Sequence, residues 1–251
     1  MTSYDDLGAA LPSAGSPQRV VSLVPSLTEA VAVTAPDLLV GATDYCTHPA
    51  GLDVRRVGGS KYPDVNAVLE LAPDLVLANE EENRAEDVAA LRAAGIPVWV
   101  TAPRTLEQAF TSLRRVLAVC GLGRPQWWDE ARQVWTRPSE GPRLRAVVPV
   151  WRRPWMALGR DTFAGDLLAH LGVDNLLGQH PDRYPRLPLG ELRALGPDVV
   201  VLPDEPYLFT AEDGPEAFPG VRPALVSGRH LTWYGPSLIE ARDLLEARLR
   251  S

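Results

Sequence analysis

Aromatic side chains recur in this sequence at the ends of apolar runs that are typical of buried strands. Seven of them follow such a predicted strand: Tyr45, Tyr62, Trp151, Trp155, Tyr207, Trp233 and Tyr234. Loops that follow parallel strands gather at one edge of a sheet, so we expect these rings to share one rim. Aromatic rings offer flat, partly apolar contact area. The pattern therefore predicts a site for a large flat ligand, and the alternative for each ring is packing inside its own part of the protein.

Arginines near these rings are candidates for binding the polar edge of such a ligand. Guanidinium groups donate paired hydrogen bonds to planar carboxylates and carboxamides; the alternative is ordinary surface charge. The candidates are Arg104, Arg152, Arg153 and Arg160. Other loops after predicted strands supply the remaining predicted ligand-binding residues, which are Ser60, Asn79 and Glu82.

Catalytic motifs are missing from the sequence. It has no G-x-S-x-G elbow, no glycine motif for phosphates or dinucleotides and no C-x-x-C pair. An enzyme on this scaffold would need two titratable groups that meet in the site, and the candidates are Asp44 with His48 and Asp204 with Glu205. Because nothing in their spacing compels either pair, we expect a binding protein that is not an enzyme.

The histidines and cysteines predict no dedicated metal centre. The four histidines lack the i, i+4 spacing of a helical metal site, and His230, in a predicted rim loop, is the best single candidate for a metal ligand. Of the two cysteines, Cys120 lies in an apolar run, which predicts a buried and unreactive thiol. We therefore expect no covalent cofactor, and any metal would arrive within the ligand.

Composition narrows the class of protein. Of the 251 residues, 45% are hydrophobic and 23% are charged, which is typical of an ordinary globular protein. The net charge of -7 argues against nucleic acid or an anionic membrane as a partner, because phosphates are bound by clustered excess Lys and Arg. The first 17 residues include Asp5 and Asp6 and do not resemble a secretory leader. The sequence thus predicts a cytoplasmic monomer without membrane insertion, unless a leader was removed.

The sequence repeats itself at an offset of 124 residues. The segment LAPDLVL at 71–77 returns as LGPDVVV at 195–201, and each copy follows a short amphipathic stretch. This order predicts a helix, a Pro-Asp turn and a buried parallel strand in both halves. We expect an α/β protein of two Rossmann-like lobes with parallel sheets, joined by a rigid connecting helix, with a ligand cleft between the lobes.

The predicted elements divide the chain into four parts. Residues 1–18 are expected to be disordered, 19–104 to form the N-terminal lobe, 105–138 the connecting helices and 139–251 the C-terminal lobe. Strands are expected at 19–24, 38–42, 75–78, 96–100, 145–150, 199–202 and 224–226. Helices are expected at 65–71, 84–94, 106–121, 125–136, 162–171, 189–195 and 236–248. A further helix should begin with Ser26 as N-cap and Glu29 closing a capping box.

Several segments together resemble a known family. They are RVVSLVPSLTE at 19–29, VGG at 57–59, PDLV at 73–76, GIPV at 95–98 and WYGPS at 233–237. The chain resembles the helical-backbone substrate-binding proteins of iron-siderophore, haem and cobalamin uptake over residues 19–249, and most of all the cobalamin-binding branch. The resemblance implies a cobalamin-like corrinoid or another metal chelate as ligand. It matches Tyr45 to an aromatic contact and places Trp151 and Trp155 in the ligand loop of the second lobe.

The resemblance leaves alternative ligands and functions open, and the sequence differs from the family in two respects. A ferric-siderophore or haem binder is the nearest alternative; a sequestering protein or an enzyme on the same scaffold is the next. The family's connecting helix has about 20 residues, or ~30 Å, whereas the segment at 125–136 is shorter. Members that dock on an ABC permease present an acidic residue on each lobe, where this sequence has Asn66 and Gly190, with Glu70 and Glu191 nearby. The expectation of a permease partner is weakened accordingly.

Overall fold

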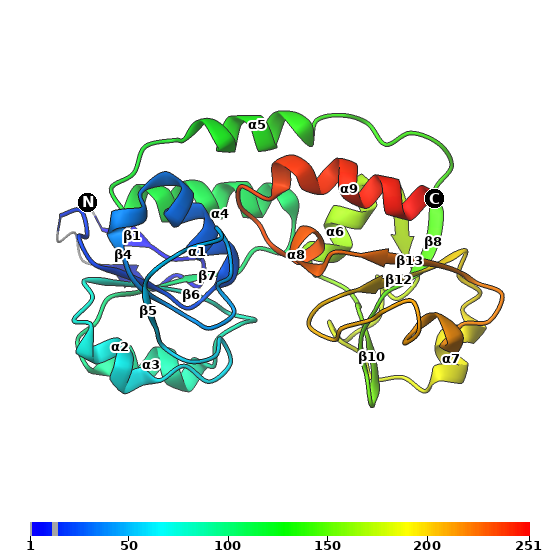
Figure 1. Cartoon of the computed structure of the whole chain (residues 1–251), viewed down its shortest axis with the longest axis horizontal. Helices are drawn as coiled ribbons and strands as arrows, with labels where there is room; N and C mark the ends of the chain where they lie inside the picture. Colours follow the sequence, from blue (N-terminus) through cyan, green and yellow to red (C-terminus); the bar gives the residue numbers. More distant parts are fainter. Residues whose placement is uncertain (1, 12–14) are drawn as a thin grey trace. The chain divides into compact units, whose positions relative to one another are not determined.

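The computed structural model describes residues 2–11 and 15–251, and the chain divides into two units (Figure 1). Unit 1 comprises Met1–Pro103, Gln108–Asp129 and Tyr234–Pro236, and unit 2 comprises Arg104–Glu107, Glu130–Trp233 and Ser237–Ser251. The division differs from the expected domains in two respects. Most of the segment expected to connect the lobes belongs to unit 1, and the chain returns to unit 1 at Tyr234–Pro236.

Unit 1 is built on a five-stranded parallel sheet with the order β5-β4-β3-β6-β7. Its strands are β3 (Val20–Ser22), β4 (Leu39–Ala42), β5 (Arg55–Arg56), β6 (Leu75–Asn79) and β7 (Val98–Thr101). Its helices are α1 (Pro25–Thr34), η1 (Pro36–Leu38), α2 (Val65–Glu70), α3 (Ala85–Ala93) and α4 (Leu106–Val119), of which the first two residues belong to unit 2. Figure 1 shows α2 and α3 on one face of the sheet, where their apolar side chains pack on the buried strands. Strands β6 and β7 are buried at every residue, which explains why they are apolar runs without alternating polar residues.

Unit 2 repeats this design with four parallel strands in the order β11-β8-β12-β13. Its strands are β8 (Leu144–Val147), β11 (Val173–Asn175), β12 (Val199–Pro203) and β13 (Arg222–Val226), and its antiparallel hairpin is β9 (Pro149–Arg152) and β10 (Trp155–Ala157). Its helices are α6 (Phe163–His170), α7 (Leu189–Ala194), η2 (Pro215–Ala217), α8 (Gly228–Thr232) and α9 (Leu238–Arg250). The predicted α/β class with parallel sheets is confirmed in both units.

The repeated sequence is also a repeated structure. In unit 1 the Asp74 carboxylate accepts the backbone N–H of Arg19 at 3.0 Å, just before β3. In unit 2 the Asp198 carboxylate accepts the backbone N–H of Arg145 at 2.8 Å, at the start of β8. Each Pro-Asp turn therefore connects a helix to its strand and also fixes the start of the neighbouring strand.

The start of α1 differs from the expected capping box. The helix begins at Pro25, its N-cap residue is Val24, and no side chain caps it. Proline suits the first turn because it has no N–H to satisfy. Ser26 and Glu29 consequently lie inside the helix, where both are buried. The segment expected to form a helix at 125–136 contains α5 (Gln126–Val134), within which the chain passes from unit 1 to unit 2.

The N-terminal segment 1–18 was expected to be disordered, and its described part is ordered. Strands β1 (Ser3–Tyr4) and β2 (Ala10–Leu11) pair antiparallel, while residues 1 and 12–14 lie outside the described residues. Asp5 is buried and accepts hydrogen bonds from the backbone N–H groups of Leu7 and Ala9. Asp5 therefore holds a tight turn, whereas the Asp6 carboxylate accepts from Ala102, Ser112 and Arg115. Within residues 2–11 and 15–251, no helix has the length and apolar character needed to cross a membrane.

Candidate functional site

In unit 1, the exposed rings of Tyr45 and Tyr62 follow the carboxyl ends of β4 and β5. Their side chains are 66% and 70% exposed. Gly59 lies close to both residues, since a Cβ atom there would be 3.4 Å from the Tyr45 ring and 4.0 Å from the Tyr62 carbonyl oxygen. The Arg84 guanidinium lies 4.6 Å from the centroid of the Tyr62 ring, a cation–π contact. We call Tyr45, Tyr62 and Arg84 the tyrosine surface.

Charged residues lie in the neighbouring loops. The Lys61 ammonium donates to the carbonyl oxygen of Glu81 at 2.5 Å. Glu82 has an exposed side chain, yet desolvation by the surrounding protein raises the pKa of its carboxyl, and the charge of Lys61 opposes that rise. Of the ligand-binding residues predicted in unit 1, Glu82 is thus exposed together with Tyr45 and Tyr62.

Three predicted ligand-binding residues of unit 1 are buried and have structural roles. Ser60 is hydrogen-bonded through its hydroxyl to Thr43 and through its carbonyl to Asn83. Asn79 accepts from the backbone N–H groups of Glu81 and Glu82 and so closes the turn after β6. Its position at the end of a strand was predicted correctly, but its side chain stabilises the loop that follows. Ser60 and Asn79 are thus corrected from ligand-binding to structural residues.

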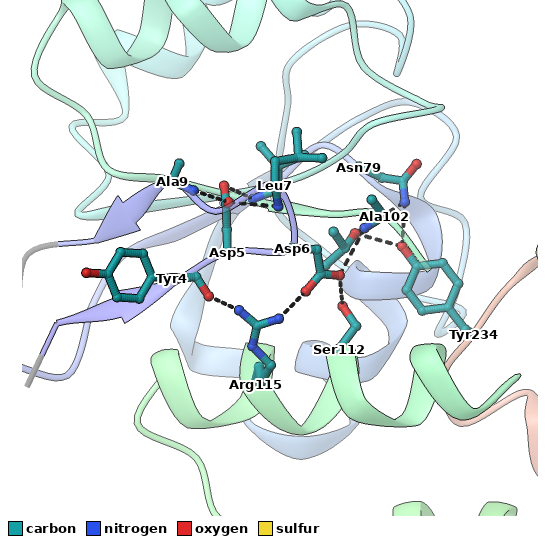
Figure 2. A network of polar contacts seen from close by, with 12 residues as sticks. Tyr4, Asp5, Asp6, Leu7, Ala9, Asn79, Ala102, Ser112, Arg115 and Tyr234 are labelled. Atoms are coloured by element: carbon teal, nitrogen blue, oxygen red, sulfur yellow. Dashed lines mark hydrogen bonds and ion pairs between the residues drawn. The ribbon is translucent and has the colours of Figure 1, made fainter. Parts of the chain in front are cut away.

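Tyr234, the third of these, anchors the returning chain in unit 1 (Figure 2). Its hydroxyl oxygen is 2.8 Å from the Asn79 amide nitrogen and 2.8 Å from the Thr101 hydroxyl. Burial raises the pKa of the Tyr234 hydroxyl far above its usual value, although the bonds from Thr101 and Asn79 oppose the shift. A phenol that is buried and bonded in this way is not available to a ligand, so this prediction is also corrected.

In unit 2, the rings of the β9–β10 hairpin and of the loop after β12 form one cluster. Trp151 meets Tyr207 edge to face at 5.6 Å, Tyr207 contacts Phe209 at 4.7 Å, and Trp155 stacks on Phe209 at 6.2 Å and meets Phe218 at 5.7 Å between ring centroids. We call these five rings the aromatic cluster. Trp151, at 42% exposure, is its outermost ring. The expected loop is a hairpin, which positions both tryptophans more firmly than a loop would.

Two of the four predicted arginines of unit 2, Arg152 and Arg160, pair with protein carboxylates. Arg152 forms ion pairs with both Asp213 and Glu216, and its guanidinium lies 5.5 Å from the Trp155 ring centroid. Arg160 is exposed and lies 3.4 Å from the Asp161 carboxylate. Arg104 is half-buried in unit 2. Arg152 therefore stabilises the aromatic cluster and has little capacity left for a ligand carboxylate.

His230 and Trp233 lie at or after α8 and face protein partners. The His230 Nε2 atom is 3.0 Å from the Glu240 carboxylate, which also accepts from Arg229 at 2.8 Å. Trp233 is buried, with the Arg229 guanidinium 5.7 Å from its ring centroid. Trp233 is therefore corrected from a ligand contact to a packed residue. His230 stays a predicted metal ligand, since among the described residues its Nδ1 atom has no hydrogen-bond partner. In the described part of the chain, no three His, Cys, Asp or Glu side chains group as a metal site would require.

One member of each titratable pair considered for an enzyme is bonded to a group outside its pair. Asp204 accepts the N–H of Gly228 at 2.6 Å, and the Nδ1 atom of His48 is hydrogen-bonded to Thr47 at 3.0 Å. Gly228 leaves no room for a side chain, since its Cβ would lie 2.2 Å from the Glu205 Cγ atom. These contacts give Asp204 and His48 structural roles in their loops.

Sequence reasoning missed several residues at these surfaces. Phe209 and Phe218 complete the aromatic cluster, Arg84 covers Tyr62, and Arg186 lines a pocket beside the hairpin. The alternation of Tyr207 and Phe209 after a strand was a usable signal for the cluster. Arg186 gave no such signal, because it reaches the hairpin only through tertiary pairing.

Known proteins were then compared with this chain. No family model matches it. The vitamin B12-binding protein of Vibrio cholerae is 22% identical over 191 residues, which are 73% of this chain and 69% of that protein. The periplasmic vitamin B12 binding protein BtuF of Vibrio cholerae superposes with a TM-score of 0.72 at 17% identity over 94% of this chain and 99% of that one. The periplasmic heme-binding protein BhuT, in complex with two hemes, gives 0.73 at 25% identity over 94% and 98%.

These similarities confirm the resemblance that the sequence motifs indicated. The chain has the fold of the substrate-binding proteins that it resembles, with an α/β unit in each half. Its relatives are binding proteins by name.

Proposed function

We propose that this protein is a non-enzymatic solute-binding protein for a bulky planar or metal-chelate ligand, with a cobalamin-like corrinoid favoured. The observation that carries the proposal is the exposure of three rings: Tyr45 and Tyr62, after the carboxyl ends of β4 and β5, and Trp151, on the hairpin strand β9 that follows β8. Exposed rings held by neighbouring side chains give large contact area at little entropic cost, as a flat ligand requires. The corrinoid is favoured because the curated relatives are vitamin B12-binding proteins.

Haem is the second candidate ligand, and one observation favours it. A phenolate oxygen can serve as an axial ligand to haem iron, and the tyrosine surface presents two exposed phenols. BhuT, which has the same fold, holds two hemes. A ferric siderophore, a sequestered natural product and an enzymatic role on this scaffold are further alternatives, for which the described side chains offer less.

A permease partner belongs to this proposal as well. The faces of α2 and α7 present exposed Asn66, Glu70, Gly190 and Glu191. Only the two glutamates offer the negative charge that pairs with arginines of a partner. Docking through Glu70 and Glu191 is therefore the form that fits this chain. If the protein docks on a permease, it lies on the side of the membrane from which that permease takes its ligand. That the protein is a cytoplasmic monomer stays a prediction from the sequence.

The test is the visible absorption spectrum of the purified protein, followed by difference spectra during titration with cyanocobalamin and, separately, with haemin. Saturable shifts in the bands of either chelate, with one midpoint, are the expected result. Spectra that equal the sum of free protein and free chelate at every ratio would contradict the proposed function.

A further inference from the structure

A pocket beside the hairpin lies wholly within unit 2. Its volume is about 530 Å³, and its lining residues are Arg152, Arg153, Pro154, Trp155, Arg186, Leu187 and Pro188. We call it the hairpin pocket. The segment at 185–187 is fixed against β10, because Ala157 donates to the Pro185 carbonyl at 3.0 Å and Leu187 donates to the Trp155 carbonyl at 3.2 Å. The pocket wall is therefore held by backbone pairing.

Three guanidinium groups line this pocket, and their charges are not equivalent. Arg152 is bound by two carboxylates, those of Asp213 and Glu216, so this trio carries no excess positive charge. Arg153 and Arg186 are exposed, and within residues 2–11 and 15–251 neither guanidinium has an ion-pair or hydrogen-bond partner. The pocket thus combines two unpaired cations with the apolar surfaces of Trp155 and Leu187.

Such a combination selects for a particular ligand chemistry. Guanidinium groups bind planar or tetrahedral oxyanions through paired, charge-assisted hydrogen bonds, which are roughly twice as strong as neutral ones. An uncharged carboxamide gains less from the same donors, and a cationic group is repelled. The apolar wall suits the rim of a flat ring system that carries the anion on a short arm.

We propose that the hairpin pocket binds an anionic substituent of the ligand, a carboxylate or a phosphodiester, with Arg153 and Arg186 as its partners. Trp155 and Leu187 contact the apolar frame next to that substituent. The inference rests on the proposed function and deepens it, because it defines the class of chelate as one with an oxyanion at its edge. It also moves the anion-binding role from Arg152, which the sequence favoured equally, to its neighbour Arg153 and to Arg186.

Two sources of this chemistry are distinguished by matched pairs of chelates. Cyanocobalamin carries a phosphodiester that dicyanocobinamide lacks. Haemin carries two carboxylates that are neutral in its dimethyl ester. The experiment measures the dissociation constants of all four chelates by fluorescence quenching of the tryptophans, for the parent protein and for the double variant Arg153→Gln/Arg186→Gln.

Arg248→Gln is the charge control, because Arg248 is an exposed arginine on α9 outside the pocket. Thermal unfolding curves of all variants confirm that they fold. The parent is expected to prefer the anionic member of at least one pair by about tenfold, as one charge-assisted pairing supports. The double variant is expected to lose that preference, and Arg248→Gln to keep it. The pair that shows the preference identifies carboxylate or phosphodiester as the source.

Dicyanocobinamide lacks the nucleotide base as well as the phosphodiester, so a preference of the parent for cyanocobalamin could come from either group. The decisive result is therefore whether the double variant loses that preference. Equal affinities of the parent for both members of every pair would overturn the inference and leave the proposed function standing. A double variant that keeps the parent's preference would overturn it too. Absence of binding by all four chelates would overturn the proposed function, and the inference with it.

Discussion

Arg19 and Asp74 are joined twice at the start of the first sheet. The backbone N–H of Arg19 donates to the Asp74 carboxylate at 3.0 Å, and the backbone N–H of Asp74 donates to the Arg19 carbonyl at 3.0 Å. The Arg19 guanidinium also donates to the Leu71 carbonyl at 2.7 Å. Arg145 and Asp198 repeat the arrangement in unit 2, where the guanidinium of Arg145 donates to the Leu195 carbonyl at 3.0 Å. The two halves thus share a fixed contact as well as a sequence motif.

Replacing either aspartate should destabilise only the unit that contains it. Asp74→Ala removes acceptors for the N–H groups of Gln18 and Arg19, and Asp198→Ala removes the acceptor for Arg145. We expect a loss of ~1 kcal/mol in the free energy of unfolding for each, because these bonds are exposed. Hydrogen-exchange mass spectrometry should show faster exchange in β3 and β6 for the first variant and in β8 and β12 for the second. Asp37→Asn, at an exposed position, is the control; equal acceleration in both units would refute the assignment.

The carboxylate of Asp6 should be more important to stability than an exposed one. It accepts from the Ala102 N–H at 3.0 Å, the Ser112 hydroxyl at 2.6 Å and the Arg115 guanidinium at 2.6 Å, as Figure 2 shows. Asp6→Ala leaves three donors without their acceptor, which we expect to cost ~2–3 kcal/mol of unfolding free energy in denaturant titrations. Asp53→Ala, at an exposed site, should change it little. A similar small effect of both variants would show that the N-terminal segment is dispensable.

The stability of unit 2 should fall in acid partly through Glu216. The Gly214 N–H, at 2.6 Å, and the Arg152 guanidinium lower the pKa of this carboxyl below its ordinary value. A depressed folded-state pKa contributes stability that is present above the unfolded-state value and is lost as the pH falls through the folded-state value. Glu216→Gln should therefore flatten the decline in melting temperature between pH 6 and pH 3. An unchanged slope in the variant would contradict this contribution.

The two cysteines should be unreactive in the folded protein. Both are free and buried, and burial raises the pKa of Cys120 to about 12 and that of Cys46 above its usual value. The thiolate is the reactive form, so a thiol reagent at pH 8 should label neither residue until denaturant is added. Rapid labelling of the native protein by a disulfide reagent would show that one of these sites opens.

Trp151 and Trp155 should have separable effects. Trp151→Ala removes an exposed ring and is expected to weaken chelate binding by ~1–3 kcal/mol with little change in stability. Trp155→Ala should weaken binding similarly and also lower the melting temperature, since Trp155 packs on Phe209 and Phe218. Tyr4→Ala is an exposed aromatic control outside both surfaces. Affinities equal to that of the parent in both tryptophan variants would remove the aromatic cluster from the site.

The sequence predicted the parallel sheets because a short, continuous apolar run after a Pro-Asp turn is typical of a strand that is buried on both faces of a sheet. It placed Asn79 at the end of a strand, which is confirmed, but it did not predict that Asn79 and Tyr234 are buried, because position along a chain does not set side-chain direction. The hairpin was missed since residues 145–150 read as one apolar strand, which in fact breaks between β8 and β9. The ordered N-terminal segment depends on partners such as Arg115, more than 100 residues away, and no local pattern reveals such contacts.

The most direct test of the central claim is a calorimetric titration of the unmodified protein with cyanocobalamin and with haemin. The account predicts saturable binding of one of these chelates at a single site, in the micromolar range or tighter. No saturable heat with either chelate, from protein shown to be folded, would contradict it.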